Sequence, residues 1–375
     1  MIRVLTFGRF ADESFGGLER YVFELGRALE GEVHFVNIVA HRGAPPDVPM
    51  AGETVYAGPL ASLGGTPVCP TMPWHALRRH WRQPFDIVHL QFPADPMAHL
   101  AYELLPRSVK RVIGWHSDIV RQQNLLKLYR PFLNHSLRAA DAIIAATPAH
   151  ISSSEQLSAV RESAKFRVVP YGFDLSRYEQ RPALADEIRR RYAGKFLVFA
   201  LGRHVYYKGF EFLIRALASL PGVALALGGQ GPLTPELERI AREAGVAERV
   251  HFLGRIPDKD LPAWYHACDV FCLPSVEPAE AFGIVQVEAM ACGKPVVCCQ
   301  LDNGVNWVNR DGETGIAVPP ADPAALAGAL APLQQDASLR VRLGDQARRR
   351  ALAHFTSAAM AKSTLAVYRE VLSRL

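Results

Sequence analysis

Several features that would mark a membrane or exported protein are missing from this sequence. None of its apolar runs reaches the roughly 20 residues that a helix needs to span a bilayer. The chain opens with a short strand-like run, Met1-Ile-Arg-Val-Leu-Thr-Phe-Gly8, which has neither the apolar region nor the cleavage site of a signal peptide. We therefore expect a cytoplasmic protein.

Cysteine is scarce, and its spacing suggests no metal chemistry. The chain has 6 cysteines in 375 residues, and no two of them form a C-x-x-C pair. Their spacings do not build a zinc site. We interpret them as small buried hydrophobic residues.

Net charge is also small. The 42 Lys and Arg residues exceed the 37 Asp and Glu residues by only 5. The basic residues are dispersed and lack the aromatic interleaving of a protein that binds single-stranded nucleic acid. This balance argues against nucleic acid as a partner, and it is compatible with an anionic ligand or a membrane surface.

Length and hydrophobic pattern predict an α/β protein with two domains. A chain of 375 residues is longer than one average core, and short apolar strands alternate with helices in both halves. This rhythm is typical of doubly wound parallel sheets. Strands are expected at 4–7, 33–39, 87–90, 111–114, 142–146, 167–169, 196–201, 223–227, 250–253, 270–273, 295–299 and 315–318. Helices are expected at 18–29, 209–220, 234–244, 259–267, 283–292 and 322–333.

Turn-forming residues over 171–182 mark the domain boundary. We predict a first domain over 1–175, completed by a C-terminal helix at 356–375, and a second domain over 176–355. Ligands of open parallel sheets bind at the carboxyl ends of the strands. We therefore expect a site in the cleft between the domains.

Two acids eight residues apart are the most informative feature. Glu280 precedes a turn that contains Gly283, and Glu288 lies in the apolar helical segment that follows. Free amides at the start of a helix favour an anion, and eight helical residues rise about 12 Å. That span suits a nucleotide-sugar, with one carboxylate on the sugar and the other on the ribose. The alternative is an ordinary helix with one solvated glutamate.

Two cations follow the first strand of the second domain. Arg203 and Lys208 lie in the run Gly202-Arg-His-Val-Tyr-Tyr-Lys-Gly209. Arg can hold a diphosphate through a bidentate fork, and Lys can hold it as a point charge. A pair of plain surface cations is the alternative. Their position between a strand and a helix favours the anion site.

The first domain offers two further candidates. Gly16 and Gly17 stand before the first helix, where backbone amides can approach a phosphate closely, although a simple turn is the alternative. His116 directly follows the strand at 111–114, and both a structural and an active-site role suit it. The acids Asp258 and Asp260 match an Asp-x-Asp metal pattern, but they precede a helix, where acids are favoured anyway. We predict no metal.

Together these residues resemble the retaining nucleotide-sugar glycosyltransferases of family 4, in which two Rossmann-like domains form the GT-B architecture. The resemblance rests on Glu280-x7-Glu288, on Gly202-Arg203 with Lys208-Gly209, on Gly16-Gly17 and on His116, and it extends over almost the whole chain. Within that family, segments 115–123 and 127–131 are similar to bacterial rhamnosyl- and mannosyltransferases of lipopolysaccharide O-antigen assembly.

The resemblance implies a role for each candidate. Arg203 and Lys208 would stabilise the departing diphosphate, and Glu280 would accept hydrogen bonds from the donor sugar. His116 would bond the sugar from the first domain, and Glu288 would bind the ribose. The other donor contacts would be Gly16, Gly17, Arg255, Ile256, Ala281, Phe282, Gly283 and Ile284. Retention is the outcome in this family, and it requires no dedicated general base.

The implied activity is transfer of mannose or a rhamnose-type hexose from a GDP-sugar to a glycan or a lipid-linked saccharide, without a cofactor, in cell-surface polysaccharide synthesis. A UDP-sugar of glucose, GlcNAc or galactose is an alternative donor. A non-catalytic nucleotide-sugar-binding module is another alternative, against which the presence of Lys208 and Glu280 argues. A dinucleotide oxidoreductase is disfavoured, because no G-x-G-x-x-G follows the first strand.

Two stretches suggest contact with a membrane. Segments 74–82 and 121–138 mix basic residues with apolar and aromatic ones. Such surfaces attract anionic lipid headgroups, so peripheral contact with the inner face of the cell membrane is one interpretation. Helices with a buried apolar side and solvated cations are the other.

Overall fold

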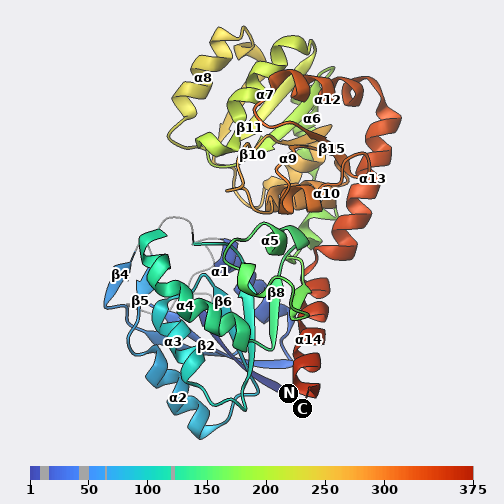
Figure 1. Ribbon diagram of the computed structural model, residues 1–375. Helices are drawn as coiled ribbons and strands as arrows, with labels where there is room; N and C mark the ends of the chain where they lie inside the picture. The colour runs from blue at the N-terminus through green and yellow to red at the C-terminus, as the bar shows by residue number, and fades with distance from the viewer. Residues whose placement is uncertain (9–16, 42–49, 64–65, 120–122, 375) are drawn as a thin grey trace. The chain divides into compact units, whose positions relative to one another are not determined.

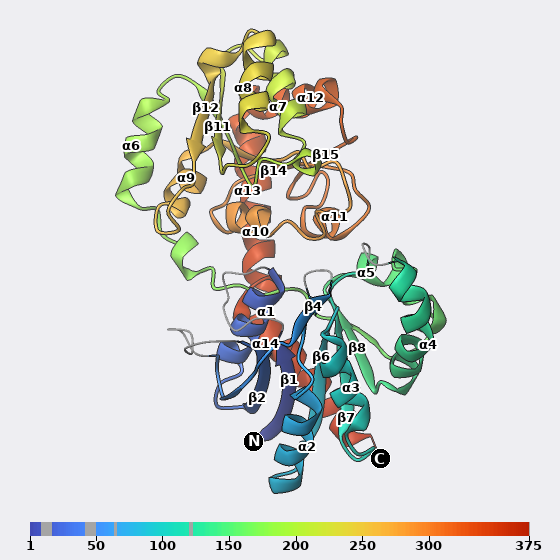
Figure 2. The ribbon, with the colours of Figure 1, turned by 90° about the vertical axis from the view of Figure 1, so that its left-hand side faces the viewer.

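The computed structural model describes residues 1–8, 17–41, 50–63, 66–119 and 123–374 (Figures 1 and 2). The chain divides into two compact units. Unit 1 comprises Met1–Phe173 and Thr356–Leu375, and unit 2 comprises Asp174–Phe355. Each unit is an α/β fold built around its own parallel sheet.

Seven parallel strands form the sheet of unit 1, in the order β3-β2-β1-β6-β7-β8-β9. The chain runs outward from the centre in both directions, which is the doubly wound arrangement. The strands are β1 (Ile2–Gly8), β2 (Val33–Ala40), β3 (Glu53–Ala57), β6 (Ile87–Phe92), β7 (Lys110–Trp115), β8 (Ala142–Ala145) and β9 (Phe166–Val168). A separate antiparallel hairpin joins β4 (Ala61–Leu63) to β5 (Thr66–Val68).

Helices cover both faces of this sheet (Figure 2). One core holds residues of α2 (Met72–Arg82), α3 (Pro96–Leu104) and α4 (Gln123–Ala139). The core on the other face holds residues of α1 (Gly17–Ala28) and α14 (Ser357–Ser373). Neighbouring strand residues point to opposite faces, so Leu5 packs into the first core and Val4 into the second. A short helix, α5 (Pro148–Ser152), follows β8.

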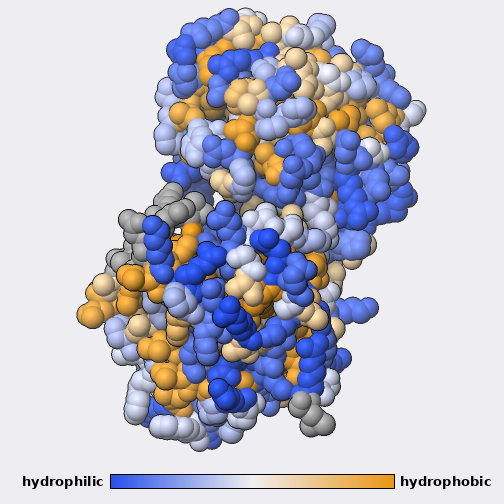
Figure 3. Space-filling model, in the orientation of Figure 1, coloured by the Kyte–Doolittle hydropathy of each residue, from blue (hydrophilic) through white to orange (hydrophobic). Residues whose placement is uncertain are grey.

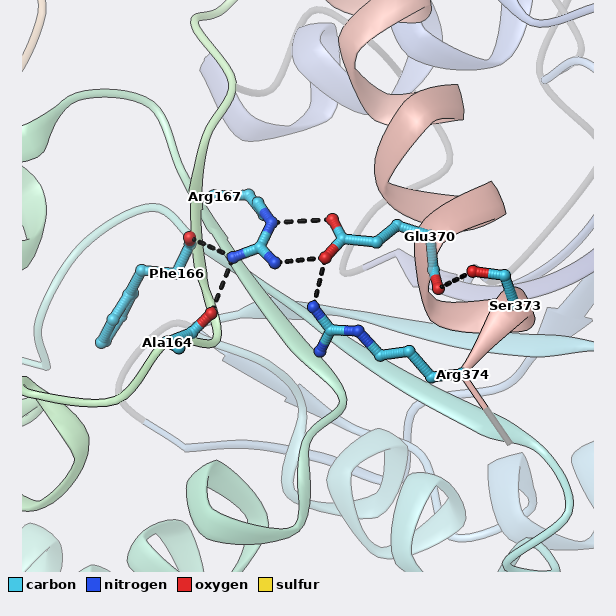
Figure 4. A network of polar contacts seen from close by, with 6 residues as sticks. All are labelled: Ala164, Phe166, Arg167, Glu370, Ser373 and Arg374. Atoms are coloured by element: carbon cyan, nitrogen blue, oxygen red, sulfur yellow. Dashed lines mark hydrogen bonds and ion pairs between the residues drawn. The ribbon is translucent and has the colours of Figure 1, made fainter.

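The last helix is tied to unit 1 by polar contacts (Figure 4). Arg167 of β9 donates from Nε to Oε2 of Glu370 at 2.8 Å, and it also donates to Oε1. Arg374 donates to the same carboxylate. The bond from Arg167, with the charges of both guanidinium groups, lowers the pKa of Glu370 to about 2. On the sheet side, the Tyr368 hydroxyl lies 2.7 Å from Nδ1 of the buried His89.

Six parallel strands form the sheet of unit 2, in the order β12-β11-β10-β13-β14-β15. The strands are β10 (Phe196–Leu201), β11 (Val223–Gly228), β12 (Val250–Gly254), β13 (Val270–Leu273), β14 (Val296–Cys299) and β15 (Gly315–Val318). The helices are α6 (Ala183–Arg191), α7 (Phe210–Ala216), α8 (Thr234–Glu243), α9 (Leu261–Ala267), α10 (Ile284–Ala291), α11 (Gly304–Val308), α12 (Pro323–Gln335) and α13 (Ala337–His354). This sheet is also doubly wound, outward from β10.

The structure contains every strand expected from the sequence and adds three more, β3, β4 and β5. β3 reads Glu-Thr-Val-Tyr-Ala and lies at a sheet edge, where only Val55 and Ala57 of its five residues are buried, so the apolar pattern is weak. The helix expected over 209–220 is wrong in extent, because α7 ends at Ala216 and a 3-10 turn over Leu217–Ser219 follows. Within the described ranges, no helix is both long and apolar enough to cross a membrane.

Candidate active site

A largely buried ion pair joins two loops of unit 2. Lys208 ends the 3-10 turn η4 (Tyr206–Lys208) after β10, and Glu280 lies between β13 and α10. The Lys208 ammonium donates to Oε2 of Glu280, and the two side chains are only 11% and 12% exposed. The Ser275 hydroxyl donates to the same oxygen at 3.1 Å. Oε1 of Glu280 receives no hydrogen bond from the part of the chain that the structure describes, so it can accept one from a ligand.

Glycines allow these two loops to approach each other. Gly209 has a left-handed φ of 63°, and a Cβ there would lie 2.1 Å from the Pro274 carbonyl oxygen. A Cβ at Gly202 would lie 3.2 Å from Cε of Lys208. A side chain at Gly209 would therefore separate the loops that bring Lys208 to Glu280.

A third loop fixes the backbone of Glu280. Asn303 caps α11, where its Oδ1 accepts from the Val305 amide at 2.9 Å. Its Nδ2 donates to the Glu280 carbonyl oxygen at 2.8 Å. Loops that follow β10, β13 and β14 thus meet around one glutamate, as expected at the carboxyl ends of parallel strands.

The turn before α10 is held rigidly. It contains the predicted donor contacts Ala281, Phe282, Gly283 and Ile284. Gly283 has a φ of 71°, and a Cβ there would lie 2.6 Å from Cδ2 of Leu273. The Phe282 carbonyl oxygen accepts from Nε2 of the buried Gln286 at 2.8 Å. The amides of this turn are therefore fixed directly after Glu280 in the chain.

Glu288 is held separately, in the interior of unit 2. Its side chain is 5% exposed, and the Tyr265 hydroxyl of α9 donates to Oε2 at 2.8 Å. Burial, and then the charge of Glu288, raise the pKa of Tyr265 well above its usual value, so the phenol remains a donor. Nη2 of Arg177 lies 3.8 Å from Oε1, and the Arg177 side chain is 37% exposed. The Glu288 carboxylate is thus held by a buried phenol and lies near one partly exposed guanidinium.

The structure leaves two predicted cations at the surface. Arg203 and Arg255 are exposed, and neither forms an ion pair with any other described residue. Ile256 is buried against β11, where a Cβ at Gly228 would lie 2.8 Å from its Cδ1. Lys208 and Glu280 are thus brought together, whereas Arg203 is not brought into contact with them.

The acids of the Asp-x-Asp run lie at the start of α9. Asp258 is exposed, and Asp260 occupies the N-cap position without accepting a cap bond through its side chain. Among the described residues, no group of three or more His, Cys, Asp or Glu side chains is arranged to hold a metal ion.

In unit 1, His116 follows β7 and is held by its neighbours. Its Nδ1 lies 2.9 Å from the Tyr171 hydroxyl, and its Nε2 lies 2.7 Å from Oε1 of Gln91. The Tyr171 ring stacks on the imidazole with centroids 5.6 Å apart. Gly17 is the first residue of α1, and Gly16 lies outside the described residues.

Four residues that hold the candidate side chains were not predicted from the sequence, namely Ser275, Asn303, Tyr265 and Gln91. Asn303 carried a usable signal, because an asparagine between a strand and a helix is a common N-cap. Ser275 lies two residues beyond β13, where the strand-end rule could have included it. Tyr265 and Gln91 lie inside apolar elements, and nothing in their spacing indicates a polar partner.

Sequence comparison places these residues in a known family. Residues 15–177 match the family described as "Glycosyltransferase Family 4", and residues 184–350 match "Glycosyl transferases group 1". The D-rhamnosyltransferase WbpZ of Pseudomonas aeruginosa is 33% identical over 365 residues, which cover 95% of this chain and 93% of that protein. The chain belongs to glycosyltransferase family 4.

Other relatives of this family 4 enzyme are similar over different shares of their length. The O-antigen chain mannosyltransferase C of Escherichia coli is 28% identical over 99% of both chains. The GDP-mannose-dependent alpha-(1-6)-phosphatidylinositol monomannoside mannosyltransferase of Mycolicibacterium smegmatis is 35% identical over 56% of this chain and 58% of that one. The crystal structure of Anabaena Alr3699/HepE in complex with UDP superposes with a TM-score of 0.80 at 22% identity, covering 98% of this chain and 100% of that one. The family 4 enzyme is a hexosyltransferase, and its fold is GT-B.

Proposed function

We propose that this enzyme transfers a hexose of the mannose or rhamnose type from a GDP-sugar to a glycan or lipid-linked saccharide, in the synthesis of a cell-surface polysaccharide. The largely buried Lys208–Glu280 pair carries the proposal, because it joins a cation for a diphosphate to an acceptor for sugar hydroxyls. The names of the rhamnosyl and mannosyl relatives support the sugar, and the GDP-mannose-dependent relative supports the nucleotide.

Lys208 supplies the main catalytic charge in this proposal. When the bond between the anomeric carbon and the diphosphate oxygen breaks, negative charge develops on the leaving phosphate. A fixed ammonium stabilises that charge more than it stabilises the intact donor. Glu280 holds the ammonium in place and keeps it paired while the site is empty. The exposed Arg203 is free to form a bidentate contact with the same diphosphate.

In this proposal, Glu280 and Glu288 bind different parts of the donor. Oε2 of Glu280 already accepts from Lys208 and Ser275, so its Oε1 is the atom that accepts from a sugar hydroxyl. The turn at 281–284 offers its amides to the donor. Tyr265 holds Oε2 of Glu288, and we assign the carboxylate of Glu288 to the ribose hydroxyls. The nucleobase is assigned to the loop with Arg255 and Ile256.

Transfer proceeds with retention of configuration in this proposal. The acceptor hydroxyl attacks the anomeric carbon on the face from which the phosphate leaves, and its proton passes to the leaving phosphate oxygen. No protein base, cofactor or metal ion is needed for this step. His116 contributes a hydrogen bond to the sugar.

Calorimetric titration of GDP, UDP, ADP and dTDP, each with magnesium and with EDTA, tests the donor. We expect selective GDP binding that is the same with and without magnesium, and weaker binding to Lys208→Ala. Selective UDP binding would show that the enzyme uses a UDP-sugar instead of a GDP-sugar, and it would leave the enzyme class unchanged. Loss of binding in EDTA would overturn the metal-independent mechanism. The anomeric configuration of the product of GDP-mannose transfer, read from one-bond ¹³C–¹H coupling, tests retention.

We also propose that unit 1 contacts an anionic membrane through α2. Trp74 and Trp81 are 58% and 72% exposed, and Arg78 and Arg82 are exposed beside them at helical spacing. The opposite side of the helix buries Met72, Ala76 and His80. Figure 3 shows hydrophobic surface over the part of unit 1 that contains α2. Paired tryptophans and arginines favour the interfacial region of anionic lipid.

Flotation with vesicles tests this contact. We expect the protein to float with vesicles that contain phosphatidylglycerol and not with pure phosphatidylcholine. The double variant Trp74→Ala/Trp81→Ala should remain in the bottom fraction of the gradient. Val341→Ala, which removes another apolar side chain that is 62% exposed, is the control and should float normally. Equal flotation of the double variant would exclude α2 as the contact.

A further inference from the structure

The contacts of His116 determine where its ring proton lies. Tyr171 is partly buried, and desolvation raises the pKa of its phenol far above the usual range. The hydroxyl therefore keeps its proton and can donate it to Nδ1 of His116 at 2.9 Å. On the other side of the ring, Oε1 of Gln91 lies 2.7 Å from Nε2. A carbonyl oxygen can only accept, so the ring proton belongs on Nε2.

The bond between Gln91 and His116 passes across a glycine. Gln91 of β6 is 4% exposed and pairs in the sheet with Gly114 of β7. A Cβ at Gly114 would lie 2.3 Å from Oε1 of Gln91 and 3.2 Å from Nε2 of His116. The missing side chain at Gly114 therefore provides the space in which this hydrogen bond forms.

Aromatic packing fixes the plane of the same ring. Tyr21 of α1 packs edge-on against both His116 and Tyr171, with centroids 4.8 Å and 5.3 Å away. The Tyr171 ring lies nearly parallel to the imidazole, at an interplanar angle of 17°. These contacts restrict rotation of the imidazole, so the ring keeps one nitrogen toward Gln91 and the other toward Tyr171.

We infer that Gln91 and Gly114 are positioning residues that hold His116 as the neutral tautomer protonated at Nε2. His116 then presents an oriented N–H donor, which a ligand hydroxyl must share with Gln91. The lone pair on Nδ1 is occupied by Tyr171, so the ring does not take a proton from an acceptor. The consequence for transfer rests on the proposed function, whereas the tautomer can be observed without it.

Long-range ¹H–¹⁵N correlation spectra of ¹⁵N-histidine-labelled protein test the tautomer directly. The His116 signals are identified by their loss in His116→Phe. We expect the Nε2–H pattern in the wild type at pH 7 and a mixture of tautomers in Gln91→Leu. An Nδ1–H pattern in the wild type, or an unchanged spectrum in Gln91→Leu, would overturn the inference.

Gln91→Glu supplies a second test that does not depend on removing the bond. A carboxylate at this position favours the imidazolium and should raise the pKa of His116 by about 1 to 3 relative to the wild type. The pH profile of kcat should gain a new limb at that pKa. The control Gln83→Glu adds the same charge at an exposed position of unit 1. It should change neither the pKa of His116 nor the pH profile of kcat. An unchanged pKa in Gln91→Glu would contradict the assignment.

Gly114→Ala should reproduce the spectrum of Gln91→Leu if the variant folds, since its Cβ displaces Gln91. Nucleotide titration of each variant separates this inference from the proposed function. The observed tautomer, together with failure of every nucleotide to bind, would leave the inference standing and reject the proposed donor. Normal nucleotide binding together with a His116 protonated at Nδ1 would leave the proposed donor standing and reject the inference about the tautomer.

Discussion

The two units present different chemistry at the carboxyl ends of the central strands of their sheets. In unit 2, the loops after the strands bring together an ammonium and a carboxylate, Lys208 and Glu280. In unit 1, the position after β7 holds an imidazole, that of His116, between an amide and a phenol. A doubly wound sheet therefore fixes where a site forms, and the loop residues decide whether it attracts an anion or recognises hydroxyl groups.

The difference also sets how strongly each site responds to mutation. Removing one member of a largely buried ion pair leaves a charge without its partner, which destabilises the fold by at most about 3–5 kcal/mol. Removing one neutral hydrogen bond costs about 1 kcal/mol. We therefore expect large effects from charge changes in unit 2 and moderate effects from changes in unit 1.

Lys208→Ala should give the largest effect. It removes the charge that we propose stabilises the leaving diphosphate, so kcat should fall by about 10² to 10³-fold. Lys195→Ala removes an exposed lysine of the same unit and is the matched control. Steady-state kinetics, with circular dichroism to confirm folding, measures the effect. Full activity in Lys208→Ala would show that the site assignment is wrong.

Tyr265→Phe should weaken nucleotide binding and leave kcat nearly unchanged. The substitution removes the phenol that donates to Glu288 at 2.8 Å. The dissociation constant should rise by about fivefold, which corresponds to about 1 kcal/mol. Glu288→Ala should raise it further, because the proposed ribose contact itself is lost. An equal fall in kcat for both variants would instead place Glu288 in the chemical step.

Tyr171→Phe tests the His116 site in unit 1. The variant loses the donor to Nδ1 of His116 but keeps the stacked ring. We expect kcat to fall by about fivefold, equivalent to about 1 kcal/mol, with no change in nucleotide affinity. A change in nucleotide affinity as large as that in Tyr265→Phe would remove the distinction between the two sites.

Glu370 offers the smallest effect, from an exposed charged pair rather than a buried one. Its folded pKa of about 2 lies below the ordinary value of 4.5, so its contribution to stability is full above pH 4.5. That contribution is lost as the pH falls through 4.5 toward 2. The unfolding free energy of Glu370→Gln should therefore vary less with pH in this window than that of the wild type. Parallel curves in urea denaturation would show that the ion pair adds nothing measurable.

The sequence predicted the strands well because each is a short apolar run between turn residues. It also located Lys208 and Glu280 in loops at strand ends, where parallel sheets bind ligands. It did not predict that they contact each other, because they lie 72 residues apart and their approach depends on Gly209 fitting against the Pro274 carbonyl. Such a fit is a property of backbone geometry and leaves no periodic pattern.

Glu288 shows the same limit on a helix. The residues of α10 from Gln286 to Ala291 are buried, so no polar face indicates where Glu288 points. Its partner Tyr265 lies in another buried helix. The acid could be recognised from its spacing to Glu280, but its inward hydrogen bond required the packing of α9 on α10.

The chain returns to unit 1 at its C-terminal end, and this affects the order in which the two units fold during synthesis. Unit 2 is one continuous segment, Asp174–Phe355, and it can fold while the ribosome is still adding residues. Unit 1 cannot complete its folding until α14 has been synthesised. Met360 and Tyr368 of α14 belong to the core on one face of its sheet, and the Tyr368 hydroxyl contacts His89. Until then, an apolar face of a finished sheet stays open to water. A chaperone that binds exposed apolar surface should therefore recognise the nascent chain through unit 1, and a premature stop before α14 should yield a protein that aggregates although unit 2 is intact.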